Sequence, residues 1–183
     1  MSVVLVSGLS GSGKSAVYRR LIELGFEAVG FDEDGFGEWF DRGTGRPVEF
    51  PTERHDGDTD GLEFRVHRDR LEELASDAAD RVVYLCGGAG HEFHFWELLD
   101  RVIYLAVDDE TLRRRLATRT DNGYGKTLEE LNGILGANAT FEASYRERDA
   151  TILDGARPLD DVVRDVLAVG EPLRTRAPKR DQT

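Results

Sequence analysis

The sequence contains a single cysteine among its 183 residues and no long apolar run. One cysteine cannot form an internal disulfide, which suits a reducing compartment. No apolar stretch approaches the roughly 20 residues that a membrane-spanning helix needs. The first residues read as an apolar strand and lack the basic-then-apolar pattern of an export signal. We therefore expect a soluble, cytoplasmic protein with no membrane partner.

Basic side chains are also scarce, since 24 Lys and Arg stand against 36 Asp and Glu and give a formal net charge of -12. Such a surface repels polyanions, so nucleic acid is not an expected partner. The basic exception is the segment 171–183, whose prolines and lack of apolar periodicity predict a frayed, flexible tail. We expect one domain over residues 1–170, as a monomer or a homodimer.

Short apolar runs alternate with longer amphipathic stretches, a pattern typical of a parallel sheet covered by helices. The predicted strands, rich in β-branched and aromatic residues, are 3–6, 27–31, 81–86, 101–107 and 150–153. The predicted helices are 15–24, 62–79, 92–99, 109–118, 127–148 and 159–168, and 41–61 is a predicted surface loop. The expected fold class is a three-layer α/β fold with five parallel strands, in which ligands bind at the carboxyl ends of the strands.

Residues 8–15 read GLSGSGKS and match the phosphate-loop (P-loop) motif G-x-x-x-x-G-K-S/T in full, between a predicted strand and a predicted helix. The glycines let backbone amides point at phosphate oxygens, and the helix N-terminus adds partial positive charge. Lys14 can reach the β- and γ-phosphates, and the Ser15 hydroxyl can ligate Mg²⁺. The motif predicts binding of a nucleoside triphosphate, with ATP and GTP both open. The predicted nucleotide-binding residues are Gly8, Ser10, Gly11, Ser12, Gly13, Lys14, Ser15 and Ala16.

Two acidic residues, Asp32 and Asp34, follow the second predicted strand. If the strand stays extended there, residues two apart point to the same side. Asp32 would then help Ser15 to hold Mg²⁺, through water, and Asp34 would orient or deprotonate an acceptor hydroxyl. The alternative is a solvated turn whose Asp residues cap a short helix that begins near Gly35.

The chain resembles the P-loop small-molecule kinases, and most of all shikimate kinase, over about residues 3–168. Besides the phosphate loop, the likeness rests on DED at 32–34, GLEFRVHRDRLEEL at 61–74, LCGGAG at 85–90, YLAVDDETLRRRL at 104–116 and ILDGARPLDDVV at 152–163. The resemblance implies that Asp32 helps to hold Mg²⁺ and that Asp34 contacts the acceptor hydroxyl. It also implies that Arg65, Gly87 and Gly88 bind the acceptor, and that Arg115 and Pro158 cover the two faces of adenine.

The sequence also departs from the shikimate kinase pattern. Cys86 stands where the family has the first glycine of a triplet, and TRTDNGYGKT at 118–127 replaces the lid motif R-P-L-L. Phe141 stands where the family has a second acceptor-binding arginine. The chemistry therefore carries over better than the substrate.

Arg119 and Lys126 are the cations that the predicted lid, about 119–127, could supply. Arg115 and Arg119 are four residues apart and share a helix face that could point at the triphosphate. We expect Arg119 to close over the γ-phosphate as a catalytic residue. For Arg113 and Arg114 a solvated helix face is the preferred interpretation.

Several aromatic and histidine residues have two interpretations. Trp39 and Phe40, on the short helix predicted after Asp34, would be an apolar wall of the acceptor site or ordinary core. His91 and His94 have a spacing that fits two zinc ligands, but packing or lining of the acceptor pocket is preferred. Cys86 is interpreted as a small apolar filler.

Together these features predict an enzyme that transfers the γ-phosphoryl group of ATP, with Mg²⁺, to a hydroxyl of a small metabolite. A nucleoside or nucleotide kinase is an alternative, because such an enzyme would differ only in its acceptor pocket. A second alternative is a nucleotide-binding regulator, since VSGLSGSGKSAVYRRLIELGF also resembles the nucleotide-binding RNase adaptor proteins.

Overall fold

The structure, a computed structural model, describes residues 2–31, 33–49, 61–77, 81–88, 92–120 and 123–174. Its main sheet has five parallel strands in the order β2-β6-β1-β7-β8. These strands are β1 (Val3–Ser7), β2 (Ala28–Gly30), β6 (Val83–Cys86), β7 (Arg101–Ala106) and β8 (Thr151–Asp154). The predicted five-stranded parallel sheet is therefore confirmed.

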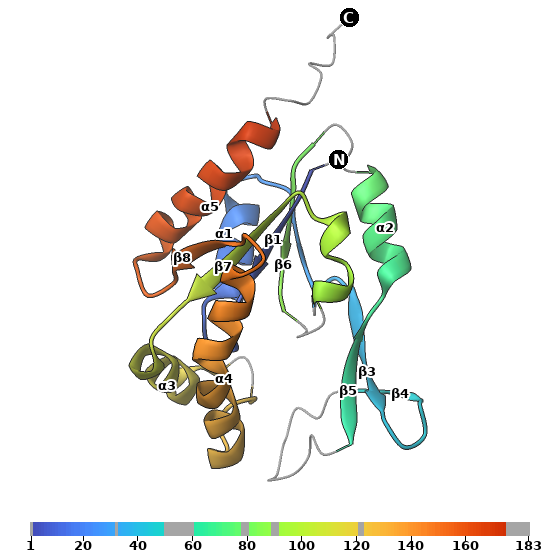
Figure 1. Ribbon diagram of the computed structural model, residues 1–183, viewed down its shortest axis with the longest axis vertical. Coiled ribbons are helices and arrows are strands. Elements are labelled where there is room, and N and C mark those ends of the chain that lie inside the picture. The colour runs from blue at the N-terminus through green and yellow to red at the C-terminus, as the bar shows by residue number, and fades with distance from the viewer. Residues whose placement is uncertain are drawn as a thin grey trace, which may run out of the picture.

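The inner strands β1, β6 and β7 are buried on both faces of the sheet, which explains why they are almost continuously apolar. In β1, Val3 and Leu5 pack into one core cluster, whereas Val4 and Val6 pack into the cluster on the other face. Helices α1 (Lys14–Glu23) and α5 (Leu159–Arg174) cover the second face, and α2 (Arg68–Asp77) and α4 (Leu128–Arg146) cover the first. Figure 1 shows the resulting three layers.

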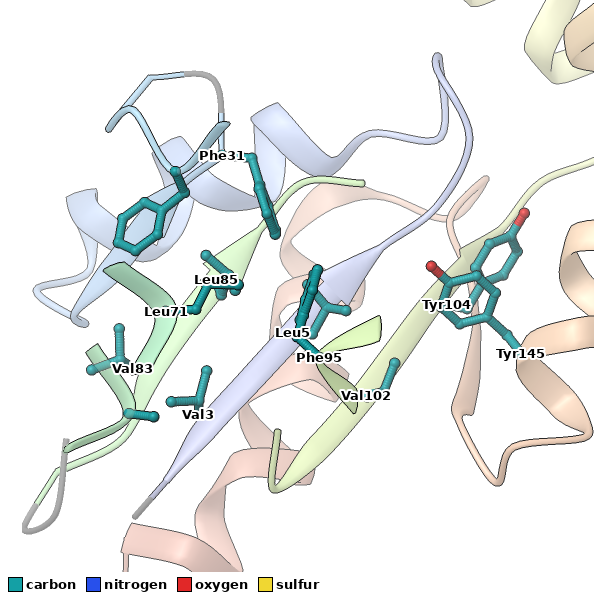
Figure 2. Packing of buried hydrophobic residues seen from close by; sticks show 12 residues of the cluster. Val3, Leu5, Phe31, Leu71, Val83, Leu85, Phe95, Val102, Tyr104 and Tyr145 are labelled. Atoms are coloured by element: carbon teal, nitrogen blue, oxygen red, sulfur yellow. The ribbon is translucent and has the colours of Figure 1, made fainter. Parts of the chain in front are cut away.

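Helix α3 (Asp109–Thr118) lies beyond the end of β7 and packs against α4 through Leu112, Leu116 and Ile134. On the face that α4 covers, the rings of Tyr104 in β7 and Tyr145 in α4 lie with centroids 4.6 Å apart (Figure 2). Both rings are buried, so they hold α4 against the sheet close to its carboxyl edge.

A second, antiparallel sheet of three strands was not predicted. It has the order β4-β3-β5, with β3 at Gly37–Asp41, β4 at Pro47–Val48 and β5 at Leu62–Val66. The predictions of a short helix at Trp39 and Phe40, of a loop from residue 41 and of a helix from residue 62 were therefore wrong. Residues 50–60 of the predicted loop lie outside the described part of the chain.

The pairing of β3 with β5 explains this difference. Trp39 lies opposite Phe64, and Glu38 lies opposite Arg65, so each face of the small sheet collects alternate residues from both strands. The ring centroids of Trp39 and Phe64 are 5.3 Å apart. This cross-strand contact joins segments distant in sequence, and it outweighs the helical pattern of 62–79, of which only α2 remains helical.

Three smaller features of the secondary structure also differ from the predictions. Strand β2 ends at Gly30, and the Asp34 amide donates to the Gly30 carbonyl over 3.0 Å, so the chain turns where an extended strand was expected. The predicted helix 92–99 is two short 3-10 segments, η2 (Glu92–His94) and η3 (Trp96–Leu98). Helix α5 continues to Arg174 rather than ending at 168.

Over the described ranges, no helix combines the length and the apolar character needed to cross a bilayer.

Candidate functional site

A cavity of about 780 Å³ lies at the carboxyl end of β1. The phosphate loop and the start of α1 line one part of it, and residues of β3, β5, η2 and α4, of the ends of β6 and α3 and of the turn after β2 contribute to the rest of its wall. Figure 1 shows α3 and α4 on one side of this end of the sheet and the small sheet on the other. The position of the cavity agrees with the rule that ligands bind at the carboxyl ends of parallel strands.

The phosphate loop adopts the backbone that its glycines allow. Gly11 has a φ of 89° and Gly13 a φ of 111°, values that residues with a side chain rarely adopt. Gly13 is the N-cap of α1, so the free amides of the first helical turn lie directly after it. This arrangement of amides and helix N-terminus suits an anion such as a phosphate group.

The cavity wall contains most of the predicted nucleotide-binding residues. Those on the loop and the start of α1 that line it are Gly8, Ser10, Gly11, Gly13, Lys14, Ser15 and Ala16. Ser12 is buried behind the loop instead. The Lys14 ammonium donates to the carbonyls of Gly8, over 2.5 Å, and Leu9, over 2.9 Å, which keeps its charge against the loop.

Arg115 on α3 joins the phosphate loop to the turn after β8. Its guanidinium donates to the Ser12 carbonyl over 2.9 Å and to the Gly155 carbonyl over 2.8 Å. Burial, followed by the neighbouring Arg114 charge, lowers the pKa of Arg115 from its ordinary value. Arg115 lines the cavity, whereas Pro158 is exposed after the Gly155 turn and is not among the described residues that line it.

Arg119 directly follows α3 as its C-cap and also reaches the loop. Its guanidinium donates to the Ser10 hydroxyl over 3.0 Å and to the Tyr124 carbonyl. Arg119 and Tyr124 both line the cavity. The side chain therefore connects the described part of the predicted lid to the phosphate loop, although Asp121 and Asn122 lie outside the described residues.

The acidic residues after β2 are arranged differently from the expectation. Asp32 lies outside the described residues. The Asp34 carboxylate accepts from the Gly30 amide over 2.7 Å and from the Tyr18 hydroxyl over 3.0 Å, and Asp34 is not among the described residues that line the cavity. Glu33, which the sequence analysis did not single out, lines the cavity instead. No pattern in the sequence distinguishes Glu33 from its two neighbours.

The residues expected at the acceptor site separate into two groups. Gly87 and Gly88 line the cavity. Arg65 lies on β5 with its guanidinium over the Phe40 ring, at 4.5 Å from the centroid, and forms an ion pair with Glu63 over 3.0 Å. It lines a smaller pocket of about 200 Å³ and is not among the described residues that line the main cavity.

Strand alternation explains the position of Arg65. The residue before it in β5, Phe64, faces Trp39 and lines the main cavity with it. Because successive side chains of a strand point to opposite faces, Arg65 lies on the face that Phe40 occupies. Of the two interpretations of Trp39 and Phe40, the cavity wall therefore holds for Trp39.

A buried polar cluster lines the cavity and escaped the sequence analysis. The Ser7 hydroxyl donates to Glu92 Oε1 over 2.9 Å, and the hydroxyls of Ser7 and Tyr145 are 2.8 Å apart. All three residues are at most 2% exposed. Burial, followed by the nearby Glu92 charge, raises the pKa of Tyr145 above its ordinary value, so this phenol stays protonated. The three residues come from segments that no local motif connects.

The histidines give no metal site within the described residues. His94 lines the smaller pocket, and His91 lies outside the described part of the chain. No group of three or more His, Cys, Asp or Glu side chains is placed to hold a metal ion over the ranges that the structure describes. Cys86 is buried in the sheet and lines the cavity beside Gly87.

Comparisons with known proteins agree with this geometry. A family model described as an AAA domain matches residues 4–154. Comparison with curated protein sequences finds no match.

Solved structures match over almost the whole chain. A shikimate kinase from Acinetobacter baumannii, in complex with shikimate, is 20% identical with a TM-score of 0.62, covering 97% of this chain and 96% of its own. A gluconokinase from Sinorhizobium meliloti 1021 is 18% identical with a TM-score of 0.54, covering 97% and 98%. A sugar kinase from Janibacter sp. HTCC2649 is 18% identical with a TM-score of 0.55, covering 97% and 99%. These structural neighbours are small-molecule kinases, and at such identities the likeness establishes the fold.

Proposed function

Because the chain belongs to the AAA domain family and has the fold of P-loop small-molecule kinases, we propose that it transfers the γ-phosphoryl group of ATP to a hydroxyl of a small metabolite. The observation that carries the proposal is the composition of one cavity. A complete phosphate loop lines part of it, and an aromatic and hydrogen-bonding wall lines the rest. Its volume of about 780 Å³ falls in the range of small-molecule sites, roughly 300–1,000 Å³.

The nucleotide would bind along the phosphate loop. The amides of residues 10–16 and the Lys14 ammonium bind the phosphates, and Arg115 and Pro158 flank the adenine, as the resemblance implies. ATP is proposed over GTP by the same resemblance.

The donor set near the loop suits Mg²⁺, which binds few protein oxygens and keeps nucleotide phosphates and water as its other ligands. The Ser15 hydroxyl, on the cavity wall, would hold this ion, with Asp32 acting through water. When bound, Mg²⁺ neutralises charge on the β- and γ-phosphates.

A carboxylate of the turn after β2 would act on the acceptor. The acceptor oxygen attacks the γ-phosphorus, the bond to the β–γ bridging oxygen breaks, and ADP leaves. The carboxylate orients the acceptor hydroxyl and receives its proton. The sequence predicts Asp34 for this role, and the position of Glu33 on the cavity wall supports Glu33.

Arg119 would stabilise the negative charge on the transferred group from the lid side. It already contacts Ser10 of the phosphate loop and the Tyr124 carbonyl, so a small movement of this segment changes its distance from the phosphates. Gly87 and Gly88 would contact the acceptor. The cytoplasmic location and the role of Arg65 stay predictions.

The experiment measures ADP release from ATP and Mg²⁺ with pools of polyols, cyclitols, sugar acids and nucleosides. We expect one pool to raise turnover well above the rate in water alone, and Lys14→Ala to abolish that increase. A pool of nucleosides or nucleotides that alone raises turnover identifies a nucleoside or nucleotide kinase. Nucleotide binding with no response to any pool would contradict the enzyme proposal and favour a regulator that distinguishes ATP from ADP.

A further inference from the structure

Beside the first glycine of the phosphate loop, the cavity has an acidic, hydrogen-bonding floor. Ser7 at the end of β1, Glu92 of η2 and Tyr145 of α4 all line it and all are buried. Because the Ser7 proton is donated to Glu92 Oε1, the Ser7 oxygen accepts from the protonated Tyr145 hydroxyl. The chain of donors therefore runs from Tyr145 through Ser7 to Glu92, and the carboxylate is its terminal acceptor.

Glu92 retains unused accepting capacity. Its second oxygen, Oε2, is buried and has no hydrogen-bond partner among the described residues. A buried carboxylate oxygen without a donor is costly, so such groups are normally paired. Glu92 lines the cavity but Oε2 is closed to solvent, so a ligand supplies the missing donor once the carboxylate turns toward the cavity.

The cations of the cavity belong to the helices beside the phosphate loop. Among the described residues that line it, the basic side chains are Lys14 and Arg19 of α1 and Arg115 and Arg119 at α3, which accompany the phosphate loop. Arg65, expected to bind the acceptor, lies with Glu63 on the face of the small sheet opposite Phe64. A carboxylate placed over Glu92 would therefore meet a like charge, and apart from these four side chains no described residue that lines the cavity is a cation.

The walls beside this floor are aromatic. Trp39 and Phe64 of the small sheet line the cavity, and so does Phe141, which lies one helical turn before Tyr145 in α4. Aromatic faces suit the C–H face of a ring or chain whose hydroxyls point to its edges, and they also suit a cation. The faces of these rings provide no partner for an anion.

We propose that the acceptor is a polyhydroxylated compound without a carboxylate, and that one of its hydroxyl or ammonium groups donates a hydrogen bond to Glu92 while Trp39, Phe64 and Phe141 cover its apolar face. This inference rests on the proposed function and specifies its substrate class. A site that binds an acidic acceptor through arginine presents a positive charge, whereas the floor of this cavity presents the negative charge of Glu92.

The test is calorimetric binding to the full chain loaded with Mg²⁺ and a non-hydrolysable ATP analogue, using pairs that differ in one group. The pairs are sorbitol against gluconate, myo-inositol against shikimate, and glucose against glucuronate, with glucosamine added to separate ammonium from hydroxyl. We expect at least one uncharged or amine-bearing compound to bind more than tenfold tighter than its acidic counterpart.

Two variants test whether this binding depends on the buried cluster of Ser7, Glu92 and Tyr145. Glu92→Gln should weaken it about ten- to hundredfold, because the charged acceptor is lost. Tyr145→Phe keeps the ring and removes the donor to Ser7, so it provides a second measurement if Glu92→Gln does not fold. Glu110→Gln, an exposed carboxylate on α3, is the matched control and should bind like the unaltered protein.

Equal or tighter binding of the acids would overturn the inference, and so would binding that neither floor variant changes, or no binding by any uncharged or amine-bearing compound. ADP release by the same compounds separates the two proposals. Selective binding that depends on Glu92 without any stimulated ADP release would support the acidic floor and contradict the kinase proposal.

Discussion

The Arg119 guanidinium lies 3.0 Å from the Ser10 hydroxyl and donates to it, which connects the end of α3 to the phosphate loop. The same guanidinium also donates a hydrogen bond to the Tyr124 carbonyl. One side chain therefore couples the position of the lid segment to the place where phosphates are expected. A cation at this point can respond to the charge of a bound nucleotide.

Arg119→Ala is expected to lower kcat for acceptor-stimulated ADP release by about 10³-fold or more, the range for a lost arginine that stabilises phosphoryl transfer. Arg114→Ala is the matched control, because Arg114 is exposed on the same helix. Steady-state kinetics with saturating acceptor measures both. Similar kcat values for the two variants would show that Arg119 is structural.

The turn after β2 offers a direct comparison of two adjacent carboxylates. Glu33→Gln should reduce kcat by about 10²–10⁴-fold with little change in ATP affinity, as for a lost general base. Asp34→Asn should act mainly on stability, because its carboxylate accepts from the Gly30 amide and the Tyr18 hydroxyl. A larger loss of kcat in Asp34→Asn, with ATP binding intact, would instead support the role predicted from the sequence.

Gly87, directly after β6, packs closely on Phe31, directly after β2. A Cβ there would lie 2.4 Å from Phe31 Cδ2 and 2.6 Å from Phe31 Cβ, too close for either residue to adjust easily. Gly87→Ala should therefore lower the free energy of unfolding by about 1–3 kcal/mol. Gly136→Ala is the control, since a Cβ in this helical position meets nothing within 4 Å.

That control should raise the free energy of unfolding by about 0.5–1 kcal/mol, because alanine loses less entropy than glycine in a helix. Urea denaturation followed by circular dichroism measures both variants. If Gly87→Ala is as stable as the unaltered protein, the backbone of Gly87 lies farther from Phe31 than it does in this structure.

The pKa of the Cys86 thiol predicts how the free energy of unfolding depends on pH. Burial, followed by the Glu33 charge, raises the pKa of this thiol well above its ordinary value. The folded protein therefore keeps a proton that the unfolded chain loses above about pH 8.5. The higher thiol pKa of the folded protein adds nothing unfavourable below that pH. Above it, the free energy of unfolding falls by up to about 1.4 kcal/mol per pH unit.

Urea denaturation at pH 8 and pH 9.5 should show this loss, and Cys86→Ala should reduce it. Iodoacetamide should label Cys86 only as fast as the protein unfolds, because the reactive thiolate is absent from the folded state. Rapid labelling under native conditions would contradict the burial of this side chain.

The sequence by itself determined the phosphate loop and the parallel sheet. The loop is local: its glycines, Lys14 and Ser15 are consecutive, and positive φ angles at Gly11 and Gly13 follow from residue type. The inner strands β1, β6 and β7 are buried on both faces, so their continuous apolar runs distinguish them from amphipathic helices without any knowledge of their partners.

Only the tertiary structure decided the acceptor side of the cavity. Residues 62–66 become a strand because β3 pairs with them, and this pairing directs Phe64 into the cavity and Arg65 away from it. Ser7 meets Glu92 and Tyr145 across 85 and 138 residues of sequence. No local pattern reports such contacts, because they depend on which elements the sheet order brings to one edge.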